Sequence, residues 1–194
     1  MSAFEKRLAK GAELQQELID FLDANGVQYL LSGYEHLKGS DDAMRIIRRN
    51  NDGGSLFIRH YPDVSVIKPD RSVLIEVKNS TGIEKECYEA YKALRGGLGI
   101  NVLLFLRNRK LCRIDDLIFQ ACDTFDRVAG FDVPVTEGVW KEPRKLPEDQ
   151  YHALLSAYRR KGKNTSGCSF AFIDFRRTHF YELEAITHSL RAAA

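Results

Sequence analysis

The sequence predicts an α/β protein in which helices flank a mixed central β-sheet, with an α+β elaboration in the C-terminal half. Residues 63–66 and 72–78 alternate between apolar and polar side chains, a pattern typical of half-buried strands. Residues 100–106 form the most apolar run of the chain, which indicates a central buried strand. Residues 3–25 carry apolar side chains at helical spacing, and residues 147–161 have the acidic start and basic end of a helix.

Length and composition favour a single globular domain. The chain has 194 residues, of which 44% are hydrophobic and 29% charged, and it is long enough to bury a core. Its net charge is only +2, so any surface that binds nucleic acid must come from local patches. We expect one domain over residues 1–194, with a core over about residues 1–110 and the elaboration over about residues 111–194.

The cysteines and the hydropathy of the chain bear on its compartment. The four cysteines are widely spaced and form no Cys-x-x-Cys pair, which predicts reduced thiols rather than a zinc or redox motif. No charged-then-apolar leader opens the sequence, and no apolar run approaches the roughly 18 residues of a membrane span. We therefore expect a cytoplasmic protein that does not enter a membrane.

The first elements are a helix and a strand. Residues 3–25 predict a helix with a buried stripe that includes Leu14, Leu18 and Phe21, and Asn25-Gly26 is a plausible stop. Residues 27–32 suit a strand. A short helix over residues 41–49 and a turn over residues 50–54 follow, and residues 56–60 run straight into the next strand.

Residues 63–66 and 72–79 predict a β-hairpin around a turn at Pro69 and Asp70. Symmetric folding about this turn fixes which residues face each other. The expected pairs are Val66 with Val73, Val64 with Ile75, and Asp63 with Glu76.

The last of these pairs places two carboxylates opposite one another, roughly 5 Å apart at Cβ. Like charges in this position repel, so we expect a positive charge between Asp63 and Glu76. Lys78, two residues further along the same strand face, is one candidate. A divalent metal such as Mg²⁺, which binds through carboxylates, is the other and the better one.

The remaining elements alternate between helix and strand. We expect a loop over residues 79–82, a helix over residues 83–94 closed by Gly96-Gly97-Leu98-Gly99, and a strand over residues 100–106. Asp115 or Asp116 suggests the cap of a helix that runs to about Arg127. Residues 130–145 predict a loop long enough to be functional. A helix over residues 147–161 and a strand over residues 169–175 complete the chain.

The hairpin residues resemble a known signature. Pro62-Asp63, followed after twelve residues by Glu76-Val77-Lys78, is similar to the motif of the PD-(D/E)xK nuclease superfamily, which includes restriction enzymes, Holliday-junction resolvases and phage exonucleases. A helix precedes the two strands, and a helix and then a strand follow them, so the resemblance covers about residues 8–107. It implies a restriction-endonuclease-like core.

The resemblance also implies a metal site. Asp63, Glu76 and the backbone carbonyl of Val77 would hold one or two Mg²⁺ ions, for which Mn²⁺ would substitute, and Lys78 would orient the attacking water. Related nucleases often add a Glu from the first helix. Lys10-Gly11-Ala12 resembles the opening of archaeal Holliday-junction resolvases, but Gln15 stands where their catalytic Glu is expected.

Two other acids of the first helix, Glu13 and Glu17, are available to complete the site. Glu17 falls on the edge of the buried stripe and Glu13 further round, so Glu17 is the favoured ligand. The competing interpretation is that both are solvated helix acids.

Further residues are candidates for substrate contact. Tyr88 or Tyr91, on the helix after Glu-x-Lys, has the position of a site-facing Gln or Tyr in related nucleases, although packing explains either ring. The arginines that end the helix at residues 147–161 and the strand at residues 169–175 suggest a phosphate-binding rim. The candidate substrate-binding residues are His60, Asn79, Tyr88, Arg159, Arg160, Arg176 and Arg177.

These observations predict a metal-dependent DNA endonuclease of broad or structure-based specificity, of a kind that a phage could encode and that would then act in the host cytoplasm. Its substrate would be single-stranded, duplex or branched DNA. A Holliday-junction resolvase, which needs a symmetric homodimer to cut two strands, is a second hypothesis. A third is a non-catalytic nucleic-acid-binding module, and a fourth is a protein-interaction domain whose acids are merely exposed.

Overall fold

The computed structural model describes residues 3–33, 58–67, 72–160 and 167–186, together with residues 43, 45 and 47. The helix predicted over residues 41–49 and the turns predicted over residues 50–54 and 67–71 lie wholly or mainly outside these residues.

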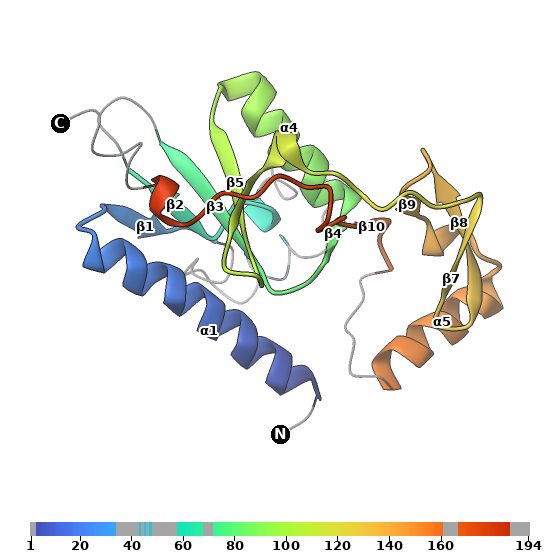
Figure 1. Cartoon of the computed structure of the whole chain (residues 1–194). Coiled ribbons are helices and arrows are strands. Elements are labelled where there is room, and N and C mark those ends of the chain that lie inside the picture. The colour runs from blue at the N-terminus through green and yellow to red at the C-terminus, as the bar shows by residue number, and fades with distance from the viewer. Residues whose placement is uncertain are drawn as a thin grey trace.

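A mixed five-stranded sheet forms the centre of the fold (Figure 1). Its strand order is β1 (Tyr29–Leu31), β2 (Val64–Val66), β3 (Val73–Lys78), β5 (Asn101–Leu106) and β6 (Leu111–Arg113). Strands β3 and β5 run parallel, and the other neighbours are antiparallel. The predicted mixed sheet is therefore confirmed, with the apolar strand β5 inside it.

Among the residues that the structure describes, helices α1 and α4 cover opposite faces of this sheet. Helix α1 (Ala3–Ala24) buries Leu14, Leu18 and Leu22 in one cluster with alternate β3 residues, Val73 and Ile75. Helix α4 (Lys85–Leu98) packs on the opposite face in a second cluster, which holds Leu74 of β3 and Leu104 of β5. Because strand side chains alternate, Glu76 and Lys78 share the α4 face with Leu74.

The predicted hairpin register is confirmed. Val64 pairs with Ile75 and Val66 with Val73 across β2 and β3. The strand expected to run in from residue 56 is wrong, because residues 58 and 59 are helical and β2 begins only at Val64. The N–H of Tyr61 closes this helical turn on the Ile58 carbonyl, and Pro62 has no N–H to give to a sheet.

A second, antiparallel sheet holds most of the C-terminal half. Its strand order is β4 (Gly82–Glu84), β10 (Phe170–Phe172), β9 (Trp140–Lys141), β8 (Phe131–Thr136) and β7 (Phe125–Val128). Helix α5 (Glu148–Arg160) packs Leu154 and Tyr158 against Val128 and Val133 of this sheet. The predicted α+β elaboration is confirmed, as are helix α5 and strand β10 within it.

The helix predicted from Asp115 or Asp116 to Arg127 is wrong. The chain makes only a 3₁₀ turn over Ile114–Asp116 and then runs extended into β7. The two aspartates do not cap a helix because their carboxylates bind elsewhere. Asp115 pairs with Lys92 and Arg95 of α4, and Asp116 accepts a hydrogen bond from the Tyr181 hydroxyl.

The long loop predicted over residues 130–145 is also wrong, since these residues form β8, β9 and a 3₁₀ turn over Pro143–Lys145. Ala129 and Gly130 have φ angles of 52° and 97°, which fold β7 onto β8 through a two-residue turn. Glu137 and Gly138 have φ angles of 53° and 68° and turn the chain from β8 into β9. Alanine and glutamate rarely adopt this backbone conformation, so in the sequence only the glycine of each turn indicates it.

Helix α4 starts later and ends later than predicted. Ile83 belongs to β4, so α4 begins at Lys85, and it continues through Gly96 and Gly97 to Leu98. Gly99, with φ 66°, provides the left-handed C-cap.

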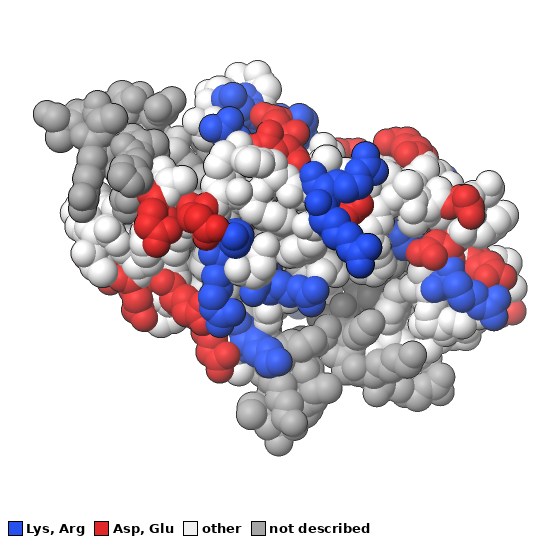
Figure 2. Space-filling view, in the orientation of Figure 1, with Lys and Arg blue, Asp and Glu red and all other residues white. Residues whose placement is uncertain are grey.

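The surface is uneven in charge although the net charge is small. On the face drawn in Figure 2, Lys and Arg side chains gather across the middle, over the β5–β6 turn and the segment after β10, while acidic side chains are frequent over α1. None of the helices that the structure describes is both long and apolar enough to cross a membrane.

We expect the α4-side core to carry much of the stability. Leu104 is completely buried, so Leu104→Ala should lower the free energy of unfolding by about 2–5 kcal/mol. Leu98 is 67% exposed, so Leu98→Ala should change the free energy of unfolding by less than about 0.5 kcal/mol. Urea unfolding measures both, and similar losses for the two variants would contradict the assignment of the core.

Candidate functional site

An ion pair between a buried acid and a partly buried lysine lies near the end of β3. The Lys78 Nζ is 2.7 Å from Oε1 of Glu76, and the two side chains are 25% and 9% exposed. Strand alternation places both side chains on the α4 face of the sheet. Strand β3 pairs with β2 on one edge and with β5 on the other, where Leu104 is the partner of Glu76. The two charges therefore lie between a central strand and a covering helix, where the Glu76 side chain is largely shielded from solvent and the Lys78 side chain is partly shielded.

Asp63 joins this pair from the start of β2. Its Oδ2 accepts a hydrogen bond of 2.7 Å from the backbone N–H of Val77, which lies between Glu76 and Lys78 in the sequence. The β2–β3 ladder ends at Val64 and Ile75, so this bond anchors Asp63 just beyond the paired residues. The structure thus brings together Asp63, Glu76 and Lys78, as the sequence predicted.

The charge state of Lys78 follows from this arrangement. Burial alone lowers the pKa of an ammonium group, but the Glu76 carboxylate, its hydrogen bond and the charge of Asp63 outweigh burial and raise the pKa of Lys78 above its ordinary value. Lys78 is therefore a cation at neutral pH. It supplies the positive charge that two neighbouring carboxylates require.

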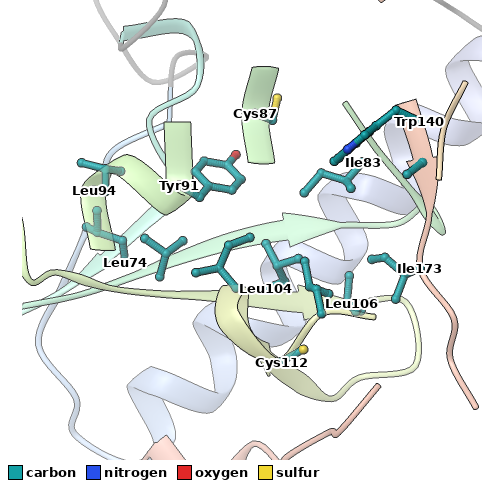
Figure 3. Close-up of a cluster of buried hydrophobic side chains, with 14 residues drawn as sticks. Leu74, Ile83, Cys87, Tyr91, Leu94, Leu104, Leu106, Cys112, Trp140 and Ile173 are labelled. Atoms are coloured by element: carbon teal, nitrogen blue, oxygen red, sulfur yellow. The ribbon is translucent and has the colours of Figure 1, made fainter. Parts of the chain in front are cut away.

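Tyr91 of α4 covers the site on the α4 face of the sheet. It is 1% exposed, and burial, the charge of Glu76 and a hydrogen bond with Glu76 raise the pKa of its hydroxyl well above the ordinary value. Figure 3 shows the Tyr91 ring over the β3 and β5 side chains. The other tyrosine considered for this role, Tyr88, packs its ring against Phe119 and Trp140.

The spacing of apolar residues in α4 distinguishes the two tyrosines. Cys87, Tyr91 and Leu94 are the buried residues of this helix, and their separations of four and three residues place them on one face. Tyr88 follows Cys87 by one residue, which turns its side chain about 100° around the helix axis from that of Cys87 and away from the buried face. This stripe is a sequence signal that favours Tyr91 as the neighbour of the acids.

His60 lies beside the start of α4. Its Nδ1 is 2.9 Å from the Sγ of Cys87, and its Nε2 is 3.9 Å from the Glu86 carboxylate. Burial lowers the pKa of His60 and outweighs the opposing effect of the Glu84 and Glu86 carboxylates, so the imidazole is mainly neutral at pH 7. Burial also raises the pKa of the Cys87 thiol to about 12. The pair is an uncharged hydrogen-bonded contact next to the ion pair.

Glu17 is placed away from the acids of the hairpin. Its carboxylate forms an ion pair of 2.7 Å with Arg109, on the β5–β6 turn, and α1 packs on the sheet face opposite to Glu76. Among the residues that the structure describes, no three His, Cys, Asp or Glu side chains form a metal-binding group, so Glu17 does not join Asp63 and Glu76 here. Glu13 is exposed on the same helix.

The other candidate residues are distributed over three segments. Asn79 is half-buried in the bend that follows Lys78 directly. Arg159 and Arg160 form the last turn of α5. Arg176 and Arg177 are exposed in the turn after β10.

The donor atoms of the hairpin fit a hard divalent cation. Asp63 and Glu76 offer carboxylate oxygens beside the Lys78 ammonium. Oxygen donors of this kind suit Mg²⁺ or Mn²⁺, which bind through one or two protein carboxylates and complete their shell with water and phosphate. The two hairpin acids are thus the residues that could serve as protein ligands for such an ion.

Comparisons with known proteins give a loose likeness. No family model matches the chain, and no curated protein sequence matches it. Among the solved structures that match is Hjc, a Holliday junction resolvase from the archaeal hyperthermophile Archaeoglobus fulgidus. It is 14% identical, the match covers 54% of this chain and 80% of that chain, and the TM-score is 0.33. A likeness at this TM-score indicates no function for this chain.

The thiols should differ in reactivity. Burial raises the pKa of both Cys87 and Cys112 from 9.0 to about 12, so at pH 8 their thiolate fraction is far below that of an ordinary cysteine. We expect iodoacetamide to modify half-buried Cys122 and Cys168 first, and Cys87 and Cys112 only after unfolding. Peptide mass spectrometry measures this, with urea-unfolded protein as control. Equal rates at Cys87 and Cys122 in the folded protein would contradict the placement of Cys87.

Proposed function

We propose that this chain is a metal-dependent nuclease that hydrolyses phosphodiester bonds in DNA. The observation that carries the proposal is the convergence of Asp63, Glu76 and Lys78 at the end of β3. Glu76 is only 7% exposed, and apolar residues in place of a buried ion pair are often neutral or stabilising for a fold. A binding or structural module does not need two acids and a lysine whose burial lowers the stability of the fold. Phosphodiester hydrolysis uses all three residues.

The two acids would hold the metal ion. Asp63 approaches from the β2 side and Glu76 from β3, so an ion bound by both links the two strands of the hairpin. When bound, Mg²⁺ polarises the scissile phosphate and lowers the pKa of a water ligand. The Val77 N–H keeps the Asp63 carboxylate in place, and the hydrogen bond with Tyr91 does the same for Glu76.

Lys78 would act on the reacting groups. Its ammonium donates hydrogen bonds only, and the acids beside it keep it protonated, so it can orient the attacking water and offset negative charge that develops on the phosphate. Its side chain is 25% exposed, which leaves the group accessible to a substrate. Burial of the remainder strengthens its electrostatic effect relative to a lysine in water.

We infer that the enzyme is an endonuclease of broad or structure-based specificity. All the proposed catalytic groups address the phosphodiester, which is the same at every position of a strand. Selection among single-stranded, duplex and branched DNA would then depend on residues outside the hairpin.

Hydrolysis of labelled DNA tests the proposal. We expect strand cleavage with Mg²⁺, none with EDTA, and a rate lowered by about 10²- to 10⁴-fold in Lys78→Ala. Glu89→Ala, which removes an exposed acid from α4, is the matched control and should cleave like the wild type. Equal cleavage in all of these reactions would exclude the proposed chemistry.

The same assay distinguishes the substrates. Single-stranded, duplex and four-way-junction DNA are compared side by side under identical salt. Comparable rates on the three substrates support broad specificity. Symmetric cleavage of the junction alone would identify a resolvase instead.

Metal binding should be measurable without DNA. Mg²⁺ at a hundredfold excess over its Kd should raise the free energy of unfolding by about 2.7 kcal/mol, because it binds only the folded hairpin. Asp63→Asn and Glu76→Gln should each abolish most of this gain, whereas Glu89→Gln should retain it. Thermal unfolding with and without Mg²⁺ gives the comparison. A gain that persists in both hairpin variants would place the metal elsewhere.

A further inference from the structure

The segment after β10 forms a rigid turn. The carbonyl of Asp174 accepts the N–H groups of Arg177 and Thr178, and its carboxylate accepts the N–H of Arg176. Buried Thr178 then hydrogen-bonds through its hydroxyl to both the N–H and the carbonyl of Ile118. The side chains of Arg176 and Arg177 are left exposed on a backbone that is fixed at both ends.

This turn is tied to the chain that leaves the candidate site. The N–H of Ile173 donates to the carbonyl of Thr81, three residues after Lys78. From the other side, the N–H of Arg107 donates to the carbonyl of Lys78 itself. The Arg107 guanidinium then lies 5.6 Å from the centre of the Phe175 ring, which joins the β5–β6 turn to the turn after β10.

The three arginines carry charge that the described part of the chain does not neutralise. Neighbouring cations on the β5–β6 turn are compensated, since Arg109 pairs with Glu17 and Lys110 with Glu182. Within the described residues, no carboxylate lies within ion-pair distance of Arg107, Arg176 or Arg177. All three side chains are exposed. Guanidinium groups repel one another and attract anions, so an external anion is a favourable partner for them.

We propose that Arg107, Arg176 and Arg177 bind the phosphate backbone of DNA beside the candidate catalytic site. The inference rests on the proposed nuclease function, because it assigns the strand that the hairpin would cut to this surface. Figure 2 shows the band of basic side chains over the β5–β6 turn and the segment after β10. The planar guanidinium group matches two oxygens of a phosphate, which favours arginine for this contact.

The geometry explains why this contact would position the substrate without reading its sequence. Phosphates repeat along every strand, so arginines that bind them set the register of the backbone and not the identity of the bases. The turn is already fixed by Asp174 and Thr178, so binding costs little ordering of the backbone. Because backbone hydrogen bonds join these segments to Thr81 and Lys78, a DNA strand held there would lie near the C-terminal end of β3.

Salt dependence of DNA binding tests the proposal. Binding of labelled duplex and single-stranded DNA is measured in EDTA over a series of salt concentrations, so that no cleavage intervenes. For the double variant Arg176→Gln, Arg177→Gln we expect weaker binding and a slope of log K against log salt reduced by about 1.8 on duplex and about 1.4 on single strands. Arg107→Gln should reduce the slope by about half as much.

The matched control is Arg127→Gln, an exposed arginine on β7 that pairs with Asp132. It should bind DNA with the wild-type slope. The proposal would be overturned, even if the wild type cleaves DNA, by one result. In that result Arg107→Gln and the double variant Arg176→Gln, Arg177→Gln have the same slope and affinity as this control on both kinds of DNA. A reduced slope on only one kind of DNA identifies the strand form that occupies the surface.

The result also separates this proposal from the nuclease itself. Lys78→Ala should lose hydrolysis, but its slope of log K against log salt should differ from the wild-type slope by no more than about 0.9, the contribution of one phosphate contact on duplex DNA. Reduced slopes in the arginine variants of a protein that never hydrolyses DNA would support the binding surface and refute the enzyme. Absence of any DNA binding by the wild type at low salt would refute both.

Discussion

The ion pair between Glu76 and Lys78 is the interaction on which the candidate site depends. Both charges lie on β3, under helix α4 and next to β5, where an unpaired charge would cost several kcal/mol. The pair is tolerated because each neighbour supports it. Asp63 adds a second negative charge near the ammonium while its own carboxylate is held by the Val77 N–H, and Tyr91 hydrogen-bonds Glu76. Removing any of these partners leaves the others in an unfavourable environment.

The two faces of strand β3 have different roles: one packs into the apolar core, and the other carries the charged residues of the candidate site. On the α1 side, β3 contributes Val73 and Ile75 to an apolar cluster. On the α4 side the same strand begins with Leu74 and then presents Glu76 and Lys78. The alternation of strand side chains makes this division possible within six residues. The apolar face anchors β3 so that its other face can carry charges that do not contribute to the core.

The C-terminal half connects to the site through backbone hydrogen bonds. Strand β4 follows the site segment directly and pairs with β10, which brings the second sheet alongside the first. The chain after β10 then bonds back to Thr81 and to Ile118. This arrangement gives the elaboration a physical role in the proposed function, because it places Arg176 and Arg177 near the chain that leaves Lys78, where a DNA backbone would pass.

The sequence by itself determined the elements whose signals are local. Apolar periodicity predicted α1, a continuous apolar run predicted β5, and an acidic start with a basic end predicted α5. The turn symmetry of the hairpin predicted the pairing of Val64 with Ile75, and with it the approach of Asp63 to Glu76. Contacts between distant residues were decided only by the tertiary structure. Asp115 resembles a helix cap in the sequence, but α4 offers it Lys92 and Arg95 instead, and Glu17 likewise pairs with Arg109 rather than with the acids of the hairpin. A short-range pattern records which backbone conformation a segment favours, whereas the partner of a charged side chain depends on which segments packing brings within a few ångströms.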